Sequence, residues 1–377
     1  MKNHKTTVLL IGGYGFFGGR LAKLLSPDAE LRVVIAGRNR SQADKLIDAL
    51  SLAGARCEFE SAQIDSTSAT LSSQVAATGA TIVVNLNGPF QRQDYRVAHA
   101  CIEAGAHYLD LADARDFVLG IGALDAQAKA AGLLVTSGAS SVPAFSSAVL
   151  DTLAPAFSEM TDIDIGITPG NRTDRGPATV AAILSYCGEP IRIWNNARWE
   201  CAAGWFKHVR HAYPAPVGSR WLALCDVPDL TLHADRYPAV RSVVFRGGLE
   251  LPVLHLGLAA VSALRRVRLL PNLTAFASFA KWASEAVIRL GTDAGAMHVD
   301  VVGKGLSGEP LGKRWTLVAK DGDGPYVPAL AAAALVRKLK NGDLHEAGAT
   351  PCVGLLTLKD FEAQFGDLAI YTTEETL

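Results

Sequence analysis

The stretch best suited to chemistry lies near the N-terminus, where an apolar run ends in a cluster of glycines. Residues 7–11 read TVLLI, residues 12–18 read GGYGFFG and residues 20–25 read RLAKLL. This order predicts a strand, a phosphate-binding loop and a helix. Such glycines allow a tight turn, close approach of the backbone to a pyrophosphate and close packing of helix on strand. The negative ligand would then meet free N–H groups at the helix N-terminus.

Two registers fit the glycines of this loop. Gly13, Gly15 and Gly18 match G-x-G-x-x-G, whereas Gly12, Gly15 and Gly18 match the looser G-x-x-G-x-x-G. Both predict a dinucleotide site. The looser register also suggests a short-chain dehydrogenase, but no tyrosine of this chain is followed four positions later by the lysine of that family's catalytic dyad. The expected nucleotide contacts are the loop residues Gly12, Gly13, Tyr14, Gly15, Phe16, Phe17 and Gly18.

The end of the second predicted strand, residues 31–36, indicates which nucleotide is bound. The sequence continues with Gly37, Arg38, Asn39 and Arg40, and Arg38 lies twenty positions beyond Gly18 with no acid nearby. An acidic side chain here would hold the ribose 2′-hydroxyl of NAD, whereas arginine accommodates a 2′-phosphate. We therefore expect NADP, bound by Arg38, Asn39 and Arg40. The alternative is that both arginines are solvated turn residues.

The elements that must position these residues are six short apolar strands that alternate with helices. This alternation predicts an α/β fold with a Rossmann-type doubly wound parallel sheet. Ligands of such sheets lie beyond the carboxyl ends of the strands. The expected strands are residues 7–11, 31–36, 57–64, 81–86, 107–111 and 133–136. Further nucleotide contacts are expected where the third, fourth and sixth strands end, at Asp65, Asn87, Gly88, Pro89, Ser137 and Gly138.

The pattern changes after residue 150. Apolar and polar residues then alternate with a period of two, which predicts a second α+β domain containing a largely antiparallel sheet. We expect an NADP-binding domain at 1–150 and a substrate and dimerisation domain at 151–325. The segment 325–377, with a strong helical pattern at 328–339, is expected to pack back on the first domain. Two apolar helical stretches, 254–267 and 273–290, are an insertion or a dimer face.

Composition narrows the classes of partner. The chain has 377 residues, a formal net charge of −1 and scattered basic residues, so neither nucleic acid nor an anionic membrane is an expected partner. Because no run of ~18 uncharged apolar residues occurs, we expect no stable membrane insertion. Six widely spaced cysteines without a C-x-x-C pair favour buried thiols in the cytoplasm. The high apolar content, 49%, favours a homodimer.

Five motifs in order resemble the saccharopine dehydrogenase family, specifically the NADP-binding domain of its uncharacterised bacterial branch. They are GGYGFFG at 12–18, AGRN at 36–39, NGPF at 87–90, GAHYLDL at 105–111 and SSVP at 140–143. The likeness covers the first ~150 residues well and the second half in outline. It implies a nucleotide-binding domain, an α+β substrate and dimerisation domain, and oxidation or reduction of a C–N bond next to a carboxylate.

The best candidates for proton transfer follow the fifth strand. Asp110 and Asp113 are the leading titratable pair, and alternation along the strand places Tyr108 and Asp110 on one face. Either carboxyl could act as general acid or base or hold a substrate amine. The alternative is that one of them caps the helix that begins near Asp116. His107 is expected to be a packing residue.

Candidate substrate contacts lie in two further loops. Ser140 and Ser141 could bind the nicotinamide or the substrate, or cap a helix entered by Pro143. Arg172 and Arg175 could bind a substrate carboxylate through their two-pronged guanidinium groups, with a solvated loop as the alternative. The spacing of His208 and His211 fits no helical ligand pair and no thiolate-rich site, so we predict no metal.

These observations predict an NADP(H)-dependent oxidoreductase that acts on a small carboxylate-bearing amine, imine or related carbonyl compound. A second possibility is a non-catalytic module that binds NADP and signals through its second domain. A third is a reductase of a lipid-like substrate that uses the apolar region 254–290 against a membrane.

Overall fold

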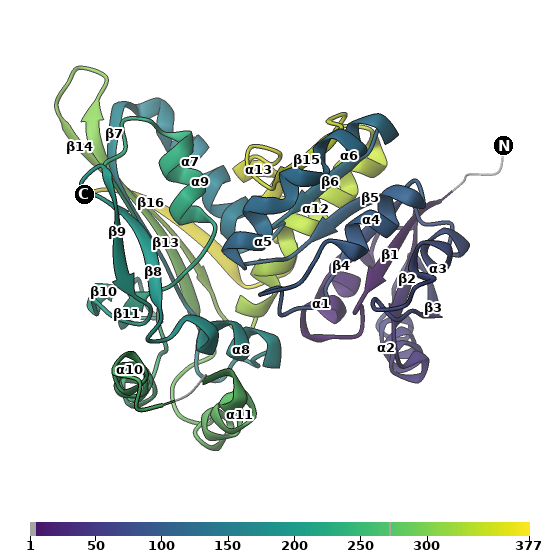
Figure 1. The fold of residues 1–377 in the computed structure, drawn as a ribbon, viewed down its shortest axis with the longest axis horizontal. Coiled ribbons are helices and arrows are strands. Elements are labelled where there is room, and N and C mark those ends of the chain that lie inside the picture. The colour runs from purple at the N-terminus through teal and green to yellow at the C-terminus, as the bar shows by residue number, and fades with distance from the viewer. Residues whose placement is uncertain (1–4, 271–272) are drawn as a thin grey trace. The chain divides into compact units, whose positions relative to one another are not determined.

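The computed structural model describes residues 5–270 and 273–377. Residues 1–4, in the predicted first domain, and 271–272, in the predicted apolar region, lie outside the described residues. The chain forms two compact units (Figure 1). The first comprises Met1–Phe145 and Tyr326–Gln364, and the second comprises Ser146–Pro325 and Phe365–Leu377.

The first unit is built on a seven-stranded sheet in the order β15-β6-β5-β4-β1-β2-β3. All its strand pairs are parallel, which confirms the predicted Rossmann-type fold. In the central strand β1, Val8–Ile11 are wholly buried. A parallel strand is covered on both faces, so its sequence is a continuous apolar run and not an alternating one. The strands are β1 (Thr6–Ile11), β2 (Leu31–Gly37), β3 (Glu58–Gln63), β4 (Ile82–Asn85), β5 (His107–Asp110), β6 (Leu134–Ser137) and β15 (Gly348–Pro351).

Helices follow the strands of this sheet and place the connecting loops at its carboxyl edge. They are α1 (Phe16–Leu25), α2 (Arg40–Leu52), α3 (Leu71–Ala77), α4 (Arg96–Glu103), α5 (Arg115–Gly120) and α6 (Asp125–Ala131), with α12 (Val327–Asn341) and α13 (Leu358–Glu362) from the C-terminal segment.

Residues 326–364 of the C-terminal segment complete the first unit, whereas residues 365–377 belong to the second unit and form the last strand of its sheet. Helix α12 contacts α1, and the Arg337 guanidinium donates to the Leu24 carbonyl at 2.7 Å while Lys340 pairs with Asp28 at 2.7 Å. Strand β15 pairs with β6, and the Thr136 hydroxyl donates to the Thr350 carbonyl at 2.9 Å. The edge strand beside β6 therefore comes from more than 200 residues further along the chain.

The second unit is built on a nine-stranded, largely antiparallel sheet, as the period-two pattern predicts. Its main path is β10-β11-β12-β7-β13-β14-β16, and β8 pairs with β12 and β9. Only the β12–β7 pair is parallel among the described pairs of this sheet. The strands are β7 (Phe157–Thr168), β8 (Pro190–Asn195), β9 (Arg198–Ala203), β10 (Val209–Ala212), β11 (Ser219–Leu224), β12 (Ser242–Gly247), β13 (Gly295–Gly305), β14 (Pro310–Ala319) and β16 (Ile370–Thr376).

Five α-helices accompany this sheet among the described residues: α7 (Ser146–Leu153), α8 (Pro177–Tyr186), α9 (Asp229–Arg236), α10 (Pro252–Arg266) and α11 (Ala277–Ala286). Helices α7 and α9 are joined by the wholly buried Asp229, which accepts hydrogen bonds from Ser146 and from His233. Across the described part of the chain, no helix combines the length and the apolar character needed to cross a membrane.

Candidate functional site

The glycine loop between β1 and α1 is shaped by three glycines with separate roles. Gly12 has a φ of +79°, in the left-handed region, and the Gly15 N–H donates to the Gly12 carbonyl at 2.9 Å to close the turn. A β-carbon at Gly18 would lie 2.5 Å from that same carbonyl oxygen, so only glycine lets α1 pack this closely. Gly13 is crowded as well, since a β-carbon there would lie 2.8 Å from the Leu10 carbonyl oxygen, so the structure is compatible with both registers.

The N-terminus of α1 is suited to an anion. Its N-cap residue is Gly15, which has no side chain to satisfy the first N–H groups, and no acidic residue occurs in the first turn. A β-carbon at Gly15 would have one described heavy atom within 4 Å besides those of its chain neighbours, the Gly12 carbonyl oxygen. The side of Gly15 that faces away from this oxygen is therefore open. The glycine loop therefore fits the pyrophosphate of a dinucleotide.

The end of β2 is packed against this loop. A β-carbon at Gly37 would lie 2.5 Å from the Tyr14 ring, and the Tyr14 hydroxyl accepts a hydrogen bond from the Asn39 N–H at 3.0 Å. These contacts fix the segment that carries Arg38, whose side chain is exposed. Next to it, Arg40 donates to the Ser61 hydroxyl at 3.0 Å. An exposed guanidinium beside the loop is suited to a phosphate.

Asp65, which follows β3, forms a turn with its own carboxylate. Its Oδ1 accepts from the Thr67 N–H at 2.9 Å and from the Thr67 hydroxyl at 2.8 Å. These hydrogen bonds, with a smaller contribution from the charge of Arg38, lower the pKa of Asp65. The carboxylate is therefore ionised at neutral pH and can accept a hydrogen bond from a ligand.

The loop after β4 reaches the same edge of the sheet. Asn87 Oδ1 would lie 2.5 Å from a β-carbon at Gly12, and the Asn87 N–H donates to Asn85 Oδ1 at 3.2 Å. The Gln93 side chain holds the rest of the loop by donating to the carbonyls of Asn87 and Pro89, each at 2.7 Å. The predicted contacts at Asn87–Pro89 are thus brought to the glycine loop.

Asp110, at the end of β5, is enclosed by hydrogen-bond donors. Its Oδ1 accepts from the Ala112 N–H at 2.9 Å, the Ser137 hydroxyl at 2.9 Å and the Gly138 N–H at 2.8 Å. The residue is 0% exposed, and burial raises its pKa to about 6 although these hydrogen bonds act in the opposite direction. Asp110 therefore fixes Ser137 and Gly138, two predicted nucleotide contacts, at the end of β6.

The neighbours of Asp110 on β5 are also held by the sheet. Tyr108 is buried, and its hydroxyl accepts from the Asn85 side chain at 3.3 Å. Burial, and then the charge of Asp110, raise the pKa of Tyr108 well above its usual value. His107 Nδ1 accepts from the Leu134 N–H at 2.9 Å, and burial lowers the pKa of His107. His107 therefore links β5 to β6, consistent with a packing role.

Asp113 differs from Asp110 because part of it is exposed. Its Oδ1 accepts a hydrogen bond from the Gln91 side chain at 3.3 Å, and burial raises the pKa of Asp113 above the usual value for an aspartate. A partly desolvated carboxyl with accessible surface is suited to accept or donate a proton. Of the two predicted acids, Asp113 is the one with accessible surface.

The two predicted substrate serines lie in a tight turn after β6. Ser140 and Ser141 are both buried, the Ser140 N–H donates to the Gly138 carbonyl at 2.7 Å, and the Phe145 N–H donates to the Ser140 carbonyl at 3.2 Å. The turn is thus continuous with the segment that Asp110 holds.

The predicted carboxylate-binding arginines lie in the second unit, in the loop after β7. The Asn171 side chain donates to the carbonyls of Val287 and Leu290 at 2.7 and 2.8 Å. Arg175 donates to Asn171 Oδ1 at 2.7 Å and is held in the loop, whereas the side chain of Arg172 is exposed. Asn171 is therefore an anchor, and Arg172 is the more accessible cation.

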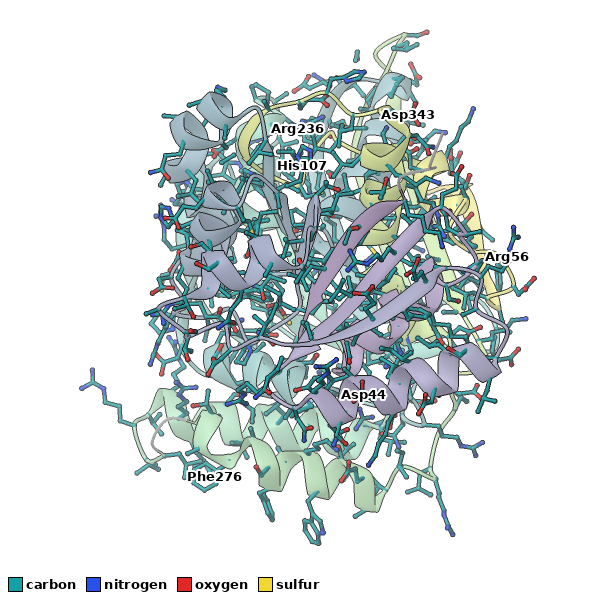
Figure 2. The ribbon with its side chains drawn as sticks, turned by 90° about the vertical axis from the view of Figure 1, so that its right-hand side faces the viewer. Asp44, Arg56, His107, Arg236, Phe276 and Asp343 are labelled. Carbon is teal, nitrogen blue, oxygen red and sulfur yellow. The ribbon has the colours of Figure 1, made fainter. Side chains whose placement is uncertain are left out.

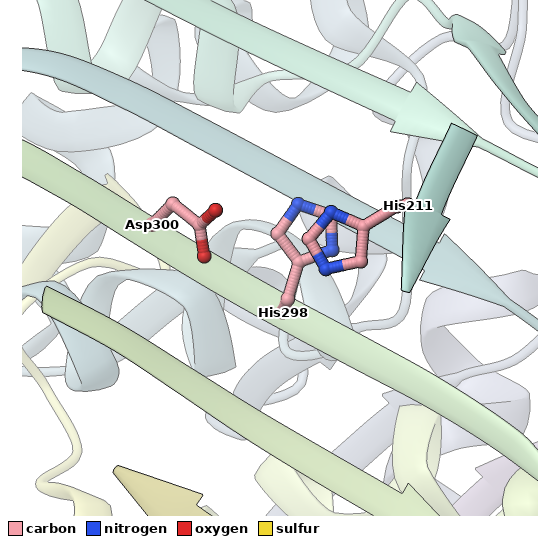
Figure 3. A group of neighbouring side chains, drawn as sticks. All are labelled: His211, His298 and Asp300. Carbon is pink, nitrogen blue, oxygen red and sulfur yellow. The ribbon is translucent and has the colours of Figure 1, made fainter. Parts of the chain in front are cut away.

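A second polar cluster lies on the sheet of the second unit, around His211 on β10 with His298 and Asp300 on β13 (Figure 3). Possible ligand atoms of these three residues lie within 4.8 Å of one another. The two imidazole rings are stacked, with centroids 3.8 Å apart and planes 5° apart. No local spacing predicts this group, because the register of β7 with β13 brings His298 and Asp300 beside Asp164.

Most polar groups of this cluster have partners, although Nε2 of His211 has no hydrogen-bond partner among the described residues. His298 Nδ1 lies 2.8 Å from the Tyr213 hydroxyl, Asp300 accepts from Arg314 at 2.8 and 2.6 Å, and Asp164 pairs with Arg246. An imidazole lone pair lies in the ring plane, so two parallel rings cannot both direct one at a common ion without a rotation. The observed arrangement is an ion-pair network. Burial and the charges of His298 and Arg314 lower the pKa of His211 to about 4, so this imidazole is neutral near pH 7.

The comparison with protein families identifies the nucleotide-binding part. Residues 8–136 match the family model described as the saccharopine dehydrogenase NADP binding domain. This match confirms the predicted resemblance to the saccharopine dehydrogenase-like family and supports a nicotinamide dinucleotide cofactor. A search of curated proteins found no match.

Two solved structures resemble the chain at low sequence identity. Apo histidine-tagged saccharopine dehydrogenase (L-Glu forming) from Saccharomyces cerevisiae superimposes with a TM-score of 0.68 at 12% identity, over 99% of this chain and 100% of that one. An amine dehydrogenase from Mycobacterium smegmatis gives a TM-score of 0.45 at 11% identity, covering 93% of this chain and 96% of that one. The yeast likeness shows that the two-unit architecture is shared.

Proposed function

Since the nucleotide-binding domain is of the saccharopine dehydrogenase type, we propose that the protein is an NADP(H)-dependent oxidoreductase. The reaction is hydride transfer to or from a C–N carbon, amine or imine, or a related carbonyl carbon of a small carboxylate-bearing substrate. The observation that carries this proposal is the glycine loop, which is open to a pyrophosphate at Gly15 and is packed through Tyr14 against the segment that bears Arg38.

The choice of NADP over NAD rests on Arg38. Its exposed guanidinium is suited to pair with a 2′-phosphate, and Asn39 and Arg40 flank it on the same loop. No acidic residue occupies this place to bind a ribose 2′-hydroxyl. The structure supports the assignment because Tyr14 holds the backbone of Asn39 and Ser61 holds the side chain of Arg40.

The nucleotide, when bound, supplies or accepts the hydride, and the chain supplies position and a proton. Asp113 accepts or donates the proton, because it is the accessible carboxyl of the pair and burial raises its pKa. Asp110 and Tyr108 are positioning residues, which hold the ends of β5 and β6 through Ser137, Gly138 and Asn85.

The substrate is recognised by its carboxylate and its reacting nitrogen or oxygen. Arg172, with Arg175 behind it in the same loop, binds the carboxylate, for which a guanidinium offers paired donors. Ser140 and Ser141 contribute to the substrate site through the turn after β6. The exposure of Arg172 supports its assignment, and the position of Ser140 and Ser141 directly after β6 is the basis for theirs.

The proposed function is tested by turnover. Purified protein is supplied with NADPH and a panel of keto acids with ammonia, imines and carbonyl compounds, and with NADP⁺ and amino acids for the reverse direction. Asp113→Asn is expected to lower kcat by ~10²–10⁴-fold while the Kd for NADPH stays the same. The matched control is Asp116→Asn, since Asp116 is exposed in the first turn of α5.

Two outcomes would count against this proposal. A protein that binds NADPH but turns over no member of the panel would be the nucleotide-sensing module. Undiminished turnover in Asp113→Asn would remove Asp113 from the proton path.

We further propose that the protein acts as a cytoplasmic homodimer, because its apolar content is high and its six cysteines are unpaired. Light scattering coupled to size-exclusion chromatography measures the molar mass. A mass of one chain at micromolar concentration would contradict the dimer.

A further inference from the structure

Helix α10 is apolar on its outer side as well as on its inner side, where Leu254, Leu258 and Val261 are half-buried. Its two buried residues are the polar His255 and Ser262, while Val253 and Val267 are 70% and 63% exposed. Leu256 and Leu264 are exposed between them. The positions 253, 256, 264 and 267 recur at the spacing of one helical face, so an apolar stripe faces solvent.

Polar contacts on the inner side fix this orientation of α10. His255 Nε2 lies 3.0 Å from His208 Nδ1, and the His255 carbonyl accepts from the Trp205 indole at 3.1 Å. At the other end, Arg265 donates to the Leu184 carbonyl at 2.9 Å and pairs with Glu189 at 2.7 Å. Because turning the helix would break these buried contacts, the outward apolar stripe is part of the fold.

Helix α11 presents a second apolar stripe. Phe276, Phe279 and Trp282 follow one another at intervals of three residues, and Phe279 and Trp282 are 62% and 63% exposed. The Phe279 and Trp282 rings lie in contact, with centroids 5.7 Å apart. Both views place α10 and α11 at the same end of the second unit, with Phe276 at its outer edge (Figures 1 and 2). We call these exposed side chains the α10–α11 face: Val253, Leu256, Leu264, Val267, Leu269, Phe276, Phe279, Trp282 and Leu290.

Charge distinguishes between the possible occupants of this face. Residues 251–290 contain five basic residues and one acid, in a chain whose net charge is −1. Arg266, Arg268 and Arg289 are exposed, and the one acid, Glu285, pairs with Lys281. The segment 251–290 therefore has a net charge of +4 against −5 for the rest of the chain. Because Arg265 pairs with Glu189 on the inner side, the exposed positive charges of the segment are the three at Arg266, Arg268 and Arg289.

A second copy of this chain fits the face poorly, because a two-fold interface would bring the same basic residues together. A bilayer surface with anionic headgroups fits both properties. Aromatic and leucine side chains enter the interface between headgroups and acyl chains, and arginines pair with the lipid phosphates.

We propose that the α10–α11 face docks the protein reversibly on the surface of an anionic lipid bilayer. Helices α10 and α11 lie in the plane of the interface, and no part of the described chain crosses it. This docking is independent of the proposed oxidoreductase activity, since the face lies wholly within the second unit and contains none of the proposed nucleotide contacts.

Co-sedimentation with vesicles tests the proposal. The full chain is expected to bind vesicles of phosphatidylcholine with phosphatidylglycerol and to bind pure phosphatidylcholine vesicles much less. The double variant Phe279→Ser/Trp282→Ser is expected to weaken binding by about tenfold or more. Arg268→Gln and Arg289→Gln are each expected to weaken it by about fivefold, and added salt should weaken binding of the wild type.

Matched controls come from exposed residues elsewhere. Leu306→Ser removes a 72% exposed leucine from the β13–β14 turn of the same unit, and Arg56→Gln removes an exposed arginine of the first unit (Figure 2). Both should bind vesicles as the wild type does. Thermal unfolding and NADPH binding establish that each variant is folded.

Each contrary outcome would overturn the docking proposal. These outcomes are that the wild type does not bind vesicles, that it binds neutral and anionic vesicles equally, or that the control variants lose as much binding as the variants of the α10–α11 face. A dimer in solution that becomes a monomer in Phe279→Ser/Trp282→Ser would assign the face to a second copy. Quenching of tryptophan fluorescence by brominated phosphatidylglycerol, lost in Trp282→Phe, provides an independent measure of insertion.

Discussion

Arg38 is the residue on which the choice of nucleotide depends. Arg38→Ala removes an exposed cation that pairs with a 2′-phosphate and leaves the glycine loop intact. Since hydrogen bonds to charged groups are worth about 1.5–3 kcal/mol, the Kd for NADPH should rise by roughly tenfold to a hundredfold. The Kd for NADH should change little, as measured by titration of nucleotide fluorescence. An equal loss for both nucleotides, or none for either, would show that Arg38 is only a turn residue.

Asp110 should leave a signature in the pH dependence of stability. Its pKa is about 6 in the folded protein against 3.8 ordinarily, so the folded state holds the proton more tightly. The contribution of Asp110 to the free energy of unfolding is therefore most favourable below about pH 4 and is lost as the pH rises through about 6. At neutral pH the ionised Asp110 lowers the free energy of unfolding by about 3 kcal/mol, because each unit of pKa difference corresponds to about 1.36 kcal/mol.

Asp110→Asn tests this sign, because asparagine does not ionise. The difference in unfolding free energy, variant minus wild type, should become more favourable to the variant by about 3 kcal/mol between about pH 4 and pH 7. Urea unfolding at a series of pH values measures it. A difference that stays constant over this range would mean that Asp110 titrates normally.

The sequence identified these residues better than it identified their roles. Strand ends and glycine spacing are local, so the positions of Arg38, Asn87 and Asp110 could be predicted. Three donors surround one oxygen of Asp110 because the loop after β6 lies next to the end of β5. This placement is tertiary, and no local pattern of the sequence encodes it. His211 and His298 also stack although they lie on β10 and β13, which are not neighbouring strands, so no local pattern or strand pairing predicts their contact.

At the scale of elements, the junction of β1 and α1 offers a matched pair of substitutions. Gly18→Ala would place a β-carbon 2.5 Å from the Gly12 carbonyl oxygen, so α1 must move away from the turn. We expect a loss of about 1–3 kcal/mol in unfolding free energy. Gly19→Ala, one position on, would meet nothing closer than Leu46 at 3.8 Å and should gain about 0.5–1 kcal/mol. Denaturant titration of both variants measures the difference, and equal effects would contradict the packing role of Gly18.

Elements with strong periodicity were predictable and short ones were not. Five of the six strands of the first sheet that precede residue 138 follow apolar runs of the sequence, whereas the edge strand β3, which reads EFESAQ, is mostly polar. Strand β15, Gly348–Pro351, contains glycine and proline and has no such run, and it exists because β6 offers an unpaired edge. Strand β10, Val209–Ala212, reads VRHA and does not alternate, and it forms because β11 supplies its pairing.

The whole molecule is folded from units that are not continuous in sequence. The first unit takes α12 and β15 from beyond residue 325, and nine residues of α12 are buried. Four of them are the larger apolar residues Val327, Leu330, Leu335 and Val336. At about 1.5–3 kcal/mol for each, their burial is worth about 6–12 kcal/mol, which is comparable with the entire stability of a typical domain at about 5–15 kcal/mol.

A fragment that ends at Phe145 should therefore fail to fold, whereas a chain joining Phe145 to Tyr326 through a short Gly/Ser linker and ending at Gln364 should fold. The joined chain restores the contacts of α12 with the 141–145 turn and with α1. It should unfold cooperatively in urea and bind NADPH with a Kd close to that of the full chain, because the glycine loop, Arg38 and Asn87 all lie in the first unit. A folded, nucleotide-binding 1–145 fragment would show that α12 is dispensable. A joined chain that folds but does not bind NADPH would show that the nucleotide site requires the second unit.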